Sequence, residues 1–262
     1  MLKKIFLIIP FFFISNCSSI NKPNDTHEKW YPNANELRQL DTRELESLTK
    51  NGNDEAILIL AMRLMNGDRI EKDQDRAFLI FKKLANKDDH RAKYLLGASY
   101  YSGAGVNKDN KAALKWFKES ALGKYDKGQY WYAFMISRGY GIETPNWKEA
   151  IKWYLKAAQQ GHTNAQLHLG EAYEQCRGGL KRDFDKAAKW YRISNTYQDN
   201  MLGRYNLRRL IDLGLTDWKK GDDGKPPNKI QDLSKERFIP CPQGIKDPLL
   251  SKKFLIKPII SN

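Results

Sequence analysis

The chain has 262 residues, of which 41% are hydrophobic and 29% charged, and its net charge is +14. These values are ordinary for a folded chain of one or two domains, and they exclude a chain that is too polar to bury a hydrophobic core. The charge is polarised, with a net −2 over residues 17–90 and +8 over residues 91–200. Such a field could steer an acidic protein partner or touch anionic lipid. The basic residues are spread over the whole chain, so we expect a solvated surface and no nucleic-acid site.

The first predicted element is a secretory signal over residues 1–16. Lys3 and Lys4 precede a ten-residue apolar run from Ile5 to Ile14, which is the charged and then apolar order of such a signal. Ten helical residues rise about 15 Å and cannot cross a hydrocarbon core of roughly 30 Å. We therefore expect a cleaved signal and no permanent transmembrane helix.

The sequence "ISNC", ending at Cys17, resembles the lipobox of bacterial lipoproteins, although Asn16 stands where that family usually has Gly, Ala or Ser. The resemblance implies a diacylglyceryl group on Cys17, which becomes the mature N-terminus. Ser18, in place of Asp, implies by resemblance to enteric lipoproteins the periplasmic face of the outer membrane. Residues 17–33 would then be a flexible tether. Under ordinary signal cleavage, Cys17 would instead be lost or free.

Two repeating helices are predicted between residues 54 and 200. In the second helix of each unit, an alanine is followed three residues later by a large apolar residue. These apolar residues are separated by 36, 37 and 37 residues and are Ile80, Trp116, Trp153 and Trp190. Seven residues earlier stand the expected N-cap residues Asp73, Asp109, Asn146 and Asp183. The first helix has small residues at Ala61, Gly97, Ala133 and Gly170, and terminating glycines at Gly67, Gly103 and Gly139. This period and helix pair predict an all-α helical solenoid.

The units "AKYLLGASYYSGAGVNKDNKAALKWFKESALG" and "AQLHLGEAYEQCRGGLKRDFDKAAKWYRIS" resemble Sel-one-like repeats, which are tetratricopeptide-like. The resemblance gives repeats at residues 54–90, 91–126, 127–163 and 164–200, with a degenerate fifth unit at 201–217. The first unit departs from the pattern, with Arg69 where later units have Gly105 and Gly141, and with Ile80 in place of Trp. Residues 34–53, which are rich in leucine, predict one or two capping helices.

Solenoids of this class bind partners in a concave groove lined by the first helix of each unit. The positions free to line it predict partner contacts at Tyr94, Tyr101, Tyr130, Trp131, Phe134, His168 and Glu171. The alternative is that several of these rings pack against neighbouring units or beneath the C-terminal tail. His162 lies in a turn between units and is expected to be a solvated loop histidine.

No catalytic, metal-binding or cofactor-binding pattern is present in the sequence. The four histidines do not combine with cysteines at metal-ligand spacing, and no nucleophile elbow or phosphate-binding loop occurs. Glu171 and Glu174 lie one helical turn apart, where solvent exposure explains them as well as acid–base chemistry does. We predict neither an enzyme nor a bound cofactor.

Residues 218–262 form a basic tail whose six prolines exclude a continuing helix. Its apolar patches favour an extended segment along the last repeats, or one that orders on a partner. Cys176 and Cys241 would pair in an oxidising periplasm, and the alternative is two unrelated thiols.

Three functions are compatible with these elements. The first is a membrane-tethered periplasmic scaffold for another protein. The second is an immunity protein against a phospholipase toxin delivered by type VI secretion, because the lipobox, repeats and added C-terminal segment resemble such proteins. The third is a cell-wall or glycan-associated factor, or a rare enzyme that uses Glu171.

Overall fold

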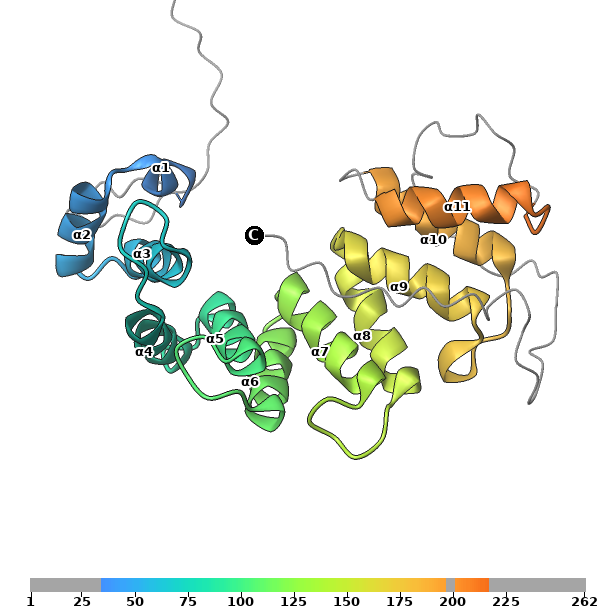
Figure 1. Ribbon diagram of the computed structural model, residues 1–262, viewed down its shortest axis with the longest axis horizontal. Helices are drawn as coiled ribbons and strands as arrows, with labels where there is room; N and C mark the ends of the chain where they lie inside the picture. Colours follow the sequence, from blue (N-terminus) through green and yellow to red (C-terminus); the bar gives the residue numbers. More distant parts are fainter. Residues whose placement is uncertain (1–33, 197–200, 217–262) are drawn as a thin grey trace, which may run out of the picture.

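The computed structural model describes residues 34–196 and 201–216, which form a curved array of helices (Figure 1). The predictions for residues 1–33 and 218–262 lie outside the described residues. The α helices of the described part are α1 (Ala34–Gln39), α2 (Thr42–Lys50), α3 (Asp54–Asn66), α4 (Gln74–Ala85), α5 (His90–Ser102), α6 (Asn110–Leu122), α7 (Asp126–Arg138), α8 (Trp147–Gln159), α9 (Thr163–Glu174), α10 (Phe184–Thr196) and α11 (Met201–Asp212). A 3-10 helix, η1 (Arg177–Gly179), follows α9.

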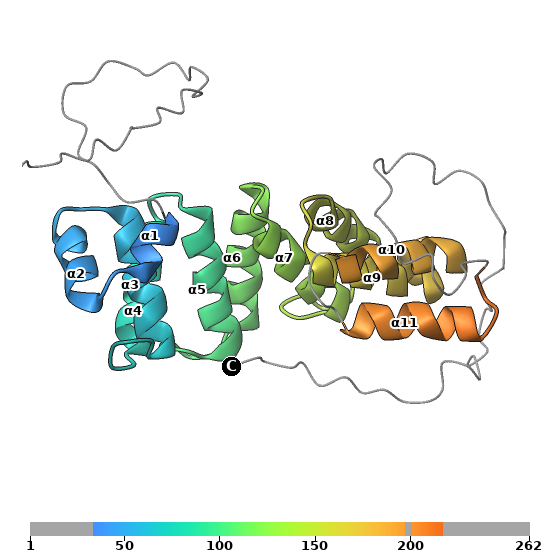
Figure 2. The same ribbon diagram turned by 90° about the horizontal axis from the view of Figure 1, so that it is seen from above.

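The predicted all-α helical solenoid is confirmed. From α2 to α11, each α helix packs on its neighbours in the sequence, and α1 packs on α3. The view from above shows the helices stacked along one long axis (Figure 2). Helices α3, α5 and α7 lie on the inner side of the arc, and α4, α6 and α8 lie outside (Figure 1).

The predicted N-cap residues start the second helix of each unit. The Oδ1 atoms of Asp73, Asp109 and Asn146 accept bonds from backbone N–H groups in the first turns of α4, α6 and α8 at 2.8–3.0 Å. Asp183 accepts from the backbone N–H of Lys186 at 2.8 Å. Each bond satisfies an otherwise orphaned donor, so the polar residue before each apolar run fixes where the helix begins.

Small residues let the paired helices of one unit approach each other closely. A Cβ atom on Gly97 would lie 2.9 Å from the ring of Phe117, and one on Gly170 would lie 2.5 Å from the ring of Tyr191. The aromatic partners recur through the units and are fully buried, at Phe81, Phe117, Tyr154 and Tyr191. In the second and fourth units, the close contact of a glycine with a large ring therefore sets how near the paired helices lie.

A second glycine position sets the distance between units. A Cβ on Gly105 would lie 2.1 Å from the carbonyl oxygen of Gln74, where α4 begins, and its φ is +71°. Gly141 and Gly178 make the equivalent approach to the first residues of α6 and α8. Arg69 holds the same left-handed conformation in the first unit, with φ 59°. No complete unit precedes it, and its carbonyl accepts a bond from Thr42 of the cap at 2.9 Å, so a side chain has room there.

Both ends of the array are closed differently from its middle. At the N-terminal end, Leu37 and Leu45 of α1 and α2 are buried, and the Arg63 guanidinium donates to the carbonyl oxygens of Arg38 and Leu40 at 3.0 and 2.7 Å. At the other end, α11 packs on α10 through Gly203 and Ser194.

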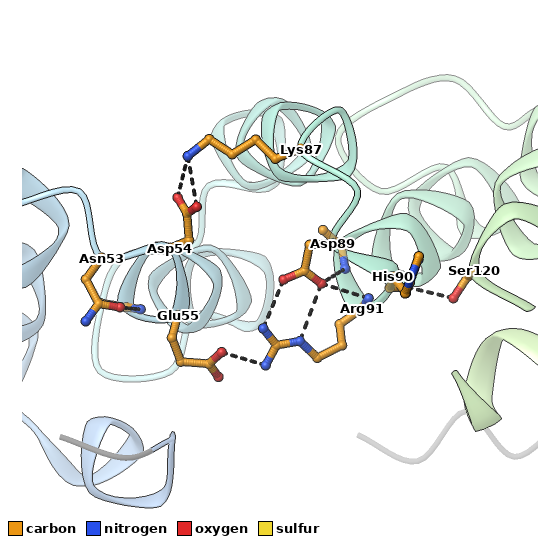
Figure 3. Close-up of polar contacts among 10 residues, drawn as sticks. Asn53, Asp54, Glu55, Lys87, Asp89, His90, Arg91 and Ser120 are labelled. Carbon is orange, nitrogen blue, oxygen red and sulfur yellow. Dashed lines mark hydrogen bonds and ion pairs between the residues drawn. The ribbon is translucent and has the colours of Figure 1, made fainter. Parts of the chain in front are cut away.

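Acidic side chains of α3 pair with Lys87 within the first unit and with Arg91 of the second unit (Figure 3). The Nζ atom of Lys87 lies 2.6 Å from a carboxylate oxygen of Asp54, and the guanidinium of Arg91 lies 2.6 Å from Glu55. A more buried bond joins α6 to the first residue of α5, in which Ser120 Oγ donates to the carbonyl of His90 at 2.6 Å. Because exposed pairs contribute at most about 1 kcal/mol each, they orient the units more than they stabilise them.

Candidate protein-binding surface

A set of aromatic rings lies along the inner helices α5, α7 and α9. We call it the aromatic face and define it as Tyr94, Tyr101, Tyr130, Trp131, Phe134, Tyr140 and His168. The ring centroids of Trp131 lie 5.2 Å from Tyr101 and 5.4 Å from Phe134. Tyr140 closes the set at 6.1 Å from both Tyr101 and Phe134. These distances are those of offset and edge-to-face pairs, which hold the rings rigidly.

The structure brings all the predicted contact residues together, although it does not expose them equally. Tyr94, Tyr101, Trp131 and Phe134 are half-buried and keep surface for a partner. Tyr130 is only 9% exposed and packs against Tyr154. It therefore supports the exposed rings from beneath, and the expected direct contact with a partner does not fit its burial. Burial raises the pKa of its phenol and keeps it neutral.

His162 is not a solvated loop histidine, and that prediction is wrong. Its ring stacks on Tyr130 at 4.4 Å, and its Nδ1 accepts from the backbone N–H of Ala165 at 3.4 Å as the N-cap of α9. Burial lowers its pKa to about 4, so the ring is neutral at physiological pH. The missed signal is the repeat position of His162, which is the one at which Asn53 and Asp89 cap the first helices of the first two units.

His168 and Glu171 form a pair at one end of the face. Nδ1 of His168 lies 2.8 Å from Oε2 of Glu171, and the imidazole packs 5.1 Å from the ring of Tyr154. Burial raises the pKa of the Glu171 carboxyl, but His168, Arg138 and Arg177 outweigh it and hold that pKa below its usual range. A carboxylate–imidazole pair without an adjacent nucleophile is suited to orienting a polar group of a ligand.

Glu174 is removed from the groove, contrary to the expectation of a solvent-exposed pair with Glu171. It is 4% exposed and accepts a bond from the hydroxyl of Tyr191 at 2.7 Å, and it also pairs with the guanidinium of Arg209. These contacts join α9, α10 and α11, so Glu174 stabilises the end of the array.

Two cations lie at the rim of the aromatic face. The guanidinium of Arg138 lies 5.6 Å from the ring centroid of Phe134, and Nζ of Lys108 lies 5.6 Å from that of Tyr101. Both side chains belong to exposed residues. Tyr140, the rim aromatic missed in the sequence, stands in the turn directly after Gly139, outside the helix on which the groove positions were counted. The face is therefore an apolar centre with a basic edge.

Among residues 34–196 and 201–216, no group of three or more His, Cys, Asp or Glu side chains could hold a metal ion. None of the helices in this part of the chain combines the length and apolar character needed to cross a bilayer. Cys176 is disulfide-bonded. The only other cysteines, Cys17 and Cys241, lie outside the described residues, so the pairing with Cys241 stays a prediction.

The fold defines an α-helical repeat protein, a solenoid of tandem helix pairs. The family model of the Sel1 repeat matches residues 54–89, 90–125, 126–162 and 163–194. The matches cover more than half of the chain, which therefore belongs to the Sel1 repeat family. Proteins of this family are protein-interaction scaffolds and are typically non-enzymatic.

Solved structures with the same repeats resemble this chain over most of its described length. A Sel1 repeat protein from Oxalobacter formigenes is 26% identical, with a TM-score of 0.62, and covers 69% of this chain and 75% of its own. The protein c5321, a protective antigen of uropathogenic Escherichia coli strains, is 29% identical with a TM-score of 0.61, over 67% of this chain and 37% of its own.

Curated relatives match over shorter stretches. A Sel1-like repeat-containing protein of Acanthamoeba polyphaga mimivirus is 35% identical over 100 residues, which are 38% of this chain and 17% of that protein. HRD3B of Arabidopsis thaliana, an ERAD-associated E3 ubiquitin-protein ligase component, is 27% identical over 122 residues, 45% of this chain and 19% of its own length. The chain thus spans less than a fifth of these two relatives.

Proposed function

We propose that the protein is an exported, membrane-tethered scaffold that binds one other protein through the aromatic face. The observation that carries this proposal is the contact of three half-buried rings, Tyr101, Trp131 and Phe134, on the inner helices α5 and α7. Interface hot spots are enriched in Trp, Tyr and Arg, and they lie in well-packed surroundings. Trp131, Tyr101 and Arg138 have this composition and packing.

The chemistry of the face narrows the kind of partner. The inner positions of α5 and α7 are uncharged, at Leu95, Ala98, Tyr101, Trp131 and Phe134, whereas Arg138 and Lys108 stand at the rim. Such a surface suits an apolar anchor that is flanked by acidic groups on the partner. The net charge of +8 over residues 91–200 would accelerate encounter with an acidic protein.

Export and tethering rest on residues 1–17 of the sequence. If Cys17 carries lipid, the mature chain from the membrane fraction will begin at Cys17 and gain the mass of a diacylglyceryl group. Cys17→Ser should move the chain to the soluble periplasmic fraction. Retention of residues 1–16 in the mature protein would contradict this part of the proposal.

A more specific hypothesis is that the partner is a phospholipase toxin delivered by type VI secretion. The chain would then be the immunity protein of that toxin. This form is supported by the lipobox, the repeats and the added C-terminal segment, which together resemble such immunity proteins. An immunity protein must block the toxin's active site stoichiometrically. Equimolar inhibition of phospholipase activity by the purified chain would support it, and a captured partner without lipase activity would exclude it.

Capture of the partner from a periplasmic extract tests the scaffold proposal. The bait is the mature chain with Cys17→Ser, compared with the double variant Tyr101→Ala/Phe134→Ala. The matched control is Leu79→Ala/Leu122→Ala, which removes two exposed apolar side chains from the outer helices α4 and α6. A stoichiometric partner should remain on the control and be lost from the aromatic-face variant, while circular dichroism shows both folded. Equal capture by all three chains would refute the proposal.

A further inference from the structure

The exposed residues of the outer helices α6 and α8 are almost all lysines. On α6 every exposed residue except Leu122 is a lysine, and on α8 every exposed residue except Gln159 is one. The lysines of each helix are three or four residues apart, so they form one stripe along it. We call the two stripes together the lysine face and define it as Lys111, Lys115 and Lys118 of α6 and Lys148, Lys152 and Lys156 of α8.

The lysine face is in register between two repeats but is not required by the fold. Lys111 and Lys115 recur 37 residues later in α8, as the first two lysines of its stripe. In α4, 36 residues earlier, the same positions hold Asp75 and Leu79, and both are exposed. The outer helix therefore accepts an acidic or an apolar residue at these positions, and packing does not explain the lysines.

The charge of the lysine face is only partly neutralised by its own helices. Helices α6 and α8 carry six lysines, two glutamates and no arginine, a net charge of +4. Glu149 pairs with Lys152 at 3.1 Å, and Glu119 lies 4.0 Å from Lys93 of the inner helix α5. Lysines four residues apart on one helix repel each other and destabilise it. Stability alone would favour alternating charges here, so the excess of one sign suits an anionic partner outside the chain.

Two tryptophan rings adjoin the ammonium groups of this face. Nζ of Lys115 lies 5.9 Å from the ring centroid of Trp116, and Nζ of Lys156 lies 3.9 Å from that of Trp153. Trp116 is half-buried, whereas Trp153 is 8% exposed. Indole rings and lysines with long apolar stems favour the boundary between water and lipid. The composition of the face is therefore that of a surface that meets lipid headgroups.

The shape of the molecule points to the same kind of partner. Helices α6 and α8 lie on the convex side of the arc, and α6 lies near its middle (Figure 1). The middle of a convex surface can rest on a plane, but it has no groove in which to enclose a chain. Lysine is also a compact, flexible point charge that lacks the planar fork with which arginine grips the phosphates of nucleic acids. Both features favour a lipid surface over a nucleic acid.

We propose that the lysine face docks the protein on an anionic lipid surface, with the convex side against the headgroups and the aromatic face turned away from them. Each lysine near such a surface strengthens binding by about fivefold. The inference goes beyond the proposed protein-binding function and takes from it only the location at a membrane. This contact holds the arc in one orientation, in which the groove stays open to a partner.

Co-sedimentation with lipid vesicles tests the lysine face. The mature full chain with Cys17→Ser, which has no lipid anchor, is mixed with vesicles of phosphatidylcholine alone or of phosphatidylcholine and phosphatidylglycerol in equal parts. Binding is expected only to the anionic vesicles, and 1 M salt should abolish it. Lys115→Glu/Lys148→Glu should weaken it by about 25-fold or more.

The matched control is Lys50→Glu/Lys127→Glu, which makes the same change in net charge at exposed residues of α2 and α7. The control should weaken binding by less than about threefold, because its charges lie away from the lipid and are screened. Circular dichroism checks that both variants are folded. Absence of binding to anionic vesicles, equal binding to both kinds of vesicle, or equal weakening by both variants would overturn the proposal.

A duplex DNA of arbitrary sequence, compared with the anionic vesicles at equal phosphate concentration, separates lipid from nucleic acid. Tighter binding to the DNA would assign the lysine face to nucleic acid and refute the proposal, whereas tighter binding to the vesicles supports it. The assay contains no partner protein and no lipid on Cys17. A failure here is therefore distinguishable from a failure of partner capture or of lipidation.

Discussion

The first and third repeats build the same helix pair from different side chains. On the inner helix of the first repeat, Leu58, Ile59 and Met62 occupy the positions that Tyr130, Trp131 and Phe134 occupy in the third. Leu58 and Ile59 are nearly fully buried, at 2% and 4% exposure. Aliphatic residues therefore suffice for this helix to pack. The fold therefore does not demand the aromatic excess of the third repeat, which agrees with the proposed role of these rings in binding.

The two ends of the array also differ in how they use charge. Near the N-terminal end, Lys87 and Asp54 pair in the open, with side chains 51% and 46% exposed (Figure 3). Near the C-terminal end, the side chain of Glu174 is 4% exposed and bonds to Tyr191 and Arg209. A carboxylate costs much more to leave unpaired when it is buried. Substitutions at matched positions should therefore have unequal effects.

The largest effect is expected at the contact between units. Gly105→Ala places a Cβ atom against the Gln74 carbonyl and forces a side chain to φ +71°, so it should cost about 4 kcal/mol of unfolding free energy. The matched change Arg69→Gly relieves the same conformation without a clash and should be neutral or stabilising by up to about 1 kcal/mol. Chemical denaturation measures both. Equal destabilisation would show that the first junction is as tight as the second.

The next effect is expected at Glu174. Glu174→Ala leaves the guanidinium of Arg209 and the hydroxyl of Tyr191 without their acceptor and should cost about 3 kcal/mol. Thermal unfolding followed by circular dichroism detects this loss. A cost below 1 kcal/mol would show that water replaces the carboxylate and that the cluster does not hold the C-terminal helices.

A smaller effect is expected from pH, through His162. Its pKa is about 4 in the folded chain and near 6.5 when unfolded, so the unfolded state binds the proton first as pH falls. The contribution of neutral His162 to the free energy of unfolding is therefore fully present above pH 6.5. It is lost progressively as the pH falls to 4, by at most about 3 kcal/mol.

His162→Asn keeps a side-chain N-cap for α9 and should flatten this part of the pH profile. Denaturant midpoints at pH 7.0, 5.5 and 4.5 compare the two chains. An identical slope in the variant would assign the pH dependence to other groups.

The smallest effect is expected at Asp54. Asp54→Asn removes the exposed pair with Lys87 and should cost less than about 1 kcal/mol, and this cost should vanish in 1 M salt. A larger, salt-independent loss would mean that the N-terminal repeats depend on this pair as the C-terminal ones depend on Glu174.

The sequence predicts well whatever repeats with the period of the units. The N-caps at Asp73, Asp109 and Asn146 are confirmed, because a capping bond depends only on residues three apart. Which rings of the aromatic face are exposed and which are buried was harder to predict from the sequence. Tyr130 lies under the face because His162, the residue that caps the first helix of the next unit, stacks on it at 4.4 Å. That contact depends on how successive units rotate, which no local pattern reports.

The most direct test of binding through the aromatic face is a calorimetric titration of the captured and purified partner. The chain is titrated as the mature protein, as Tyr101→Ala/Phe134→Ala and as the outer-helix control Leu79→Ala/Leu122→Ala. Two lost hot-spot rings should raise the Kd by about 100-fold or more, and the control should stay within about twofold. Unchanged affinity in the folded aromatic-face variant would contradict the assignment of this face to binding.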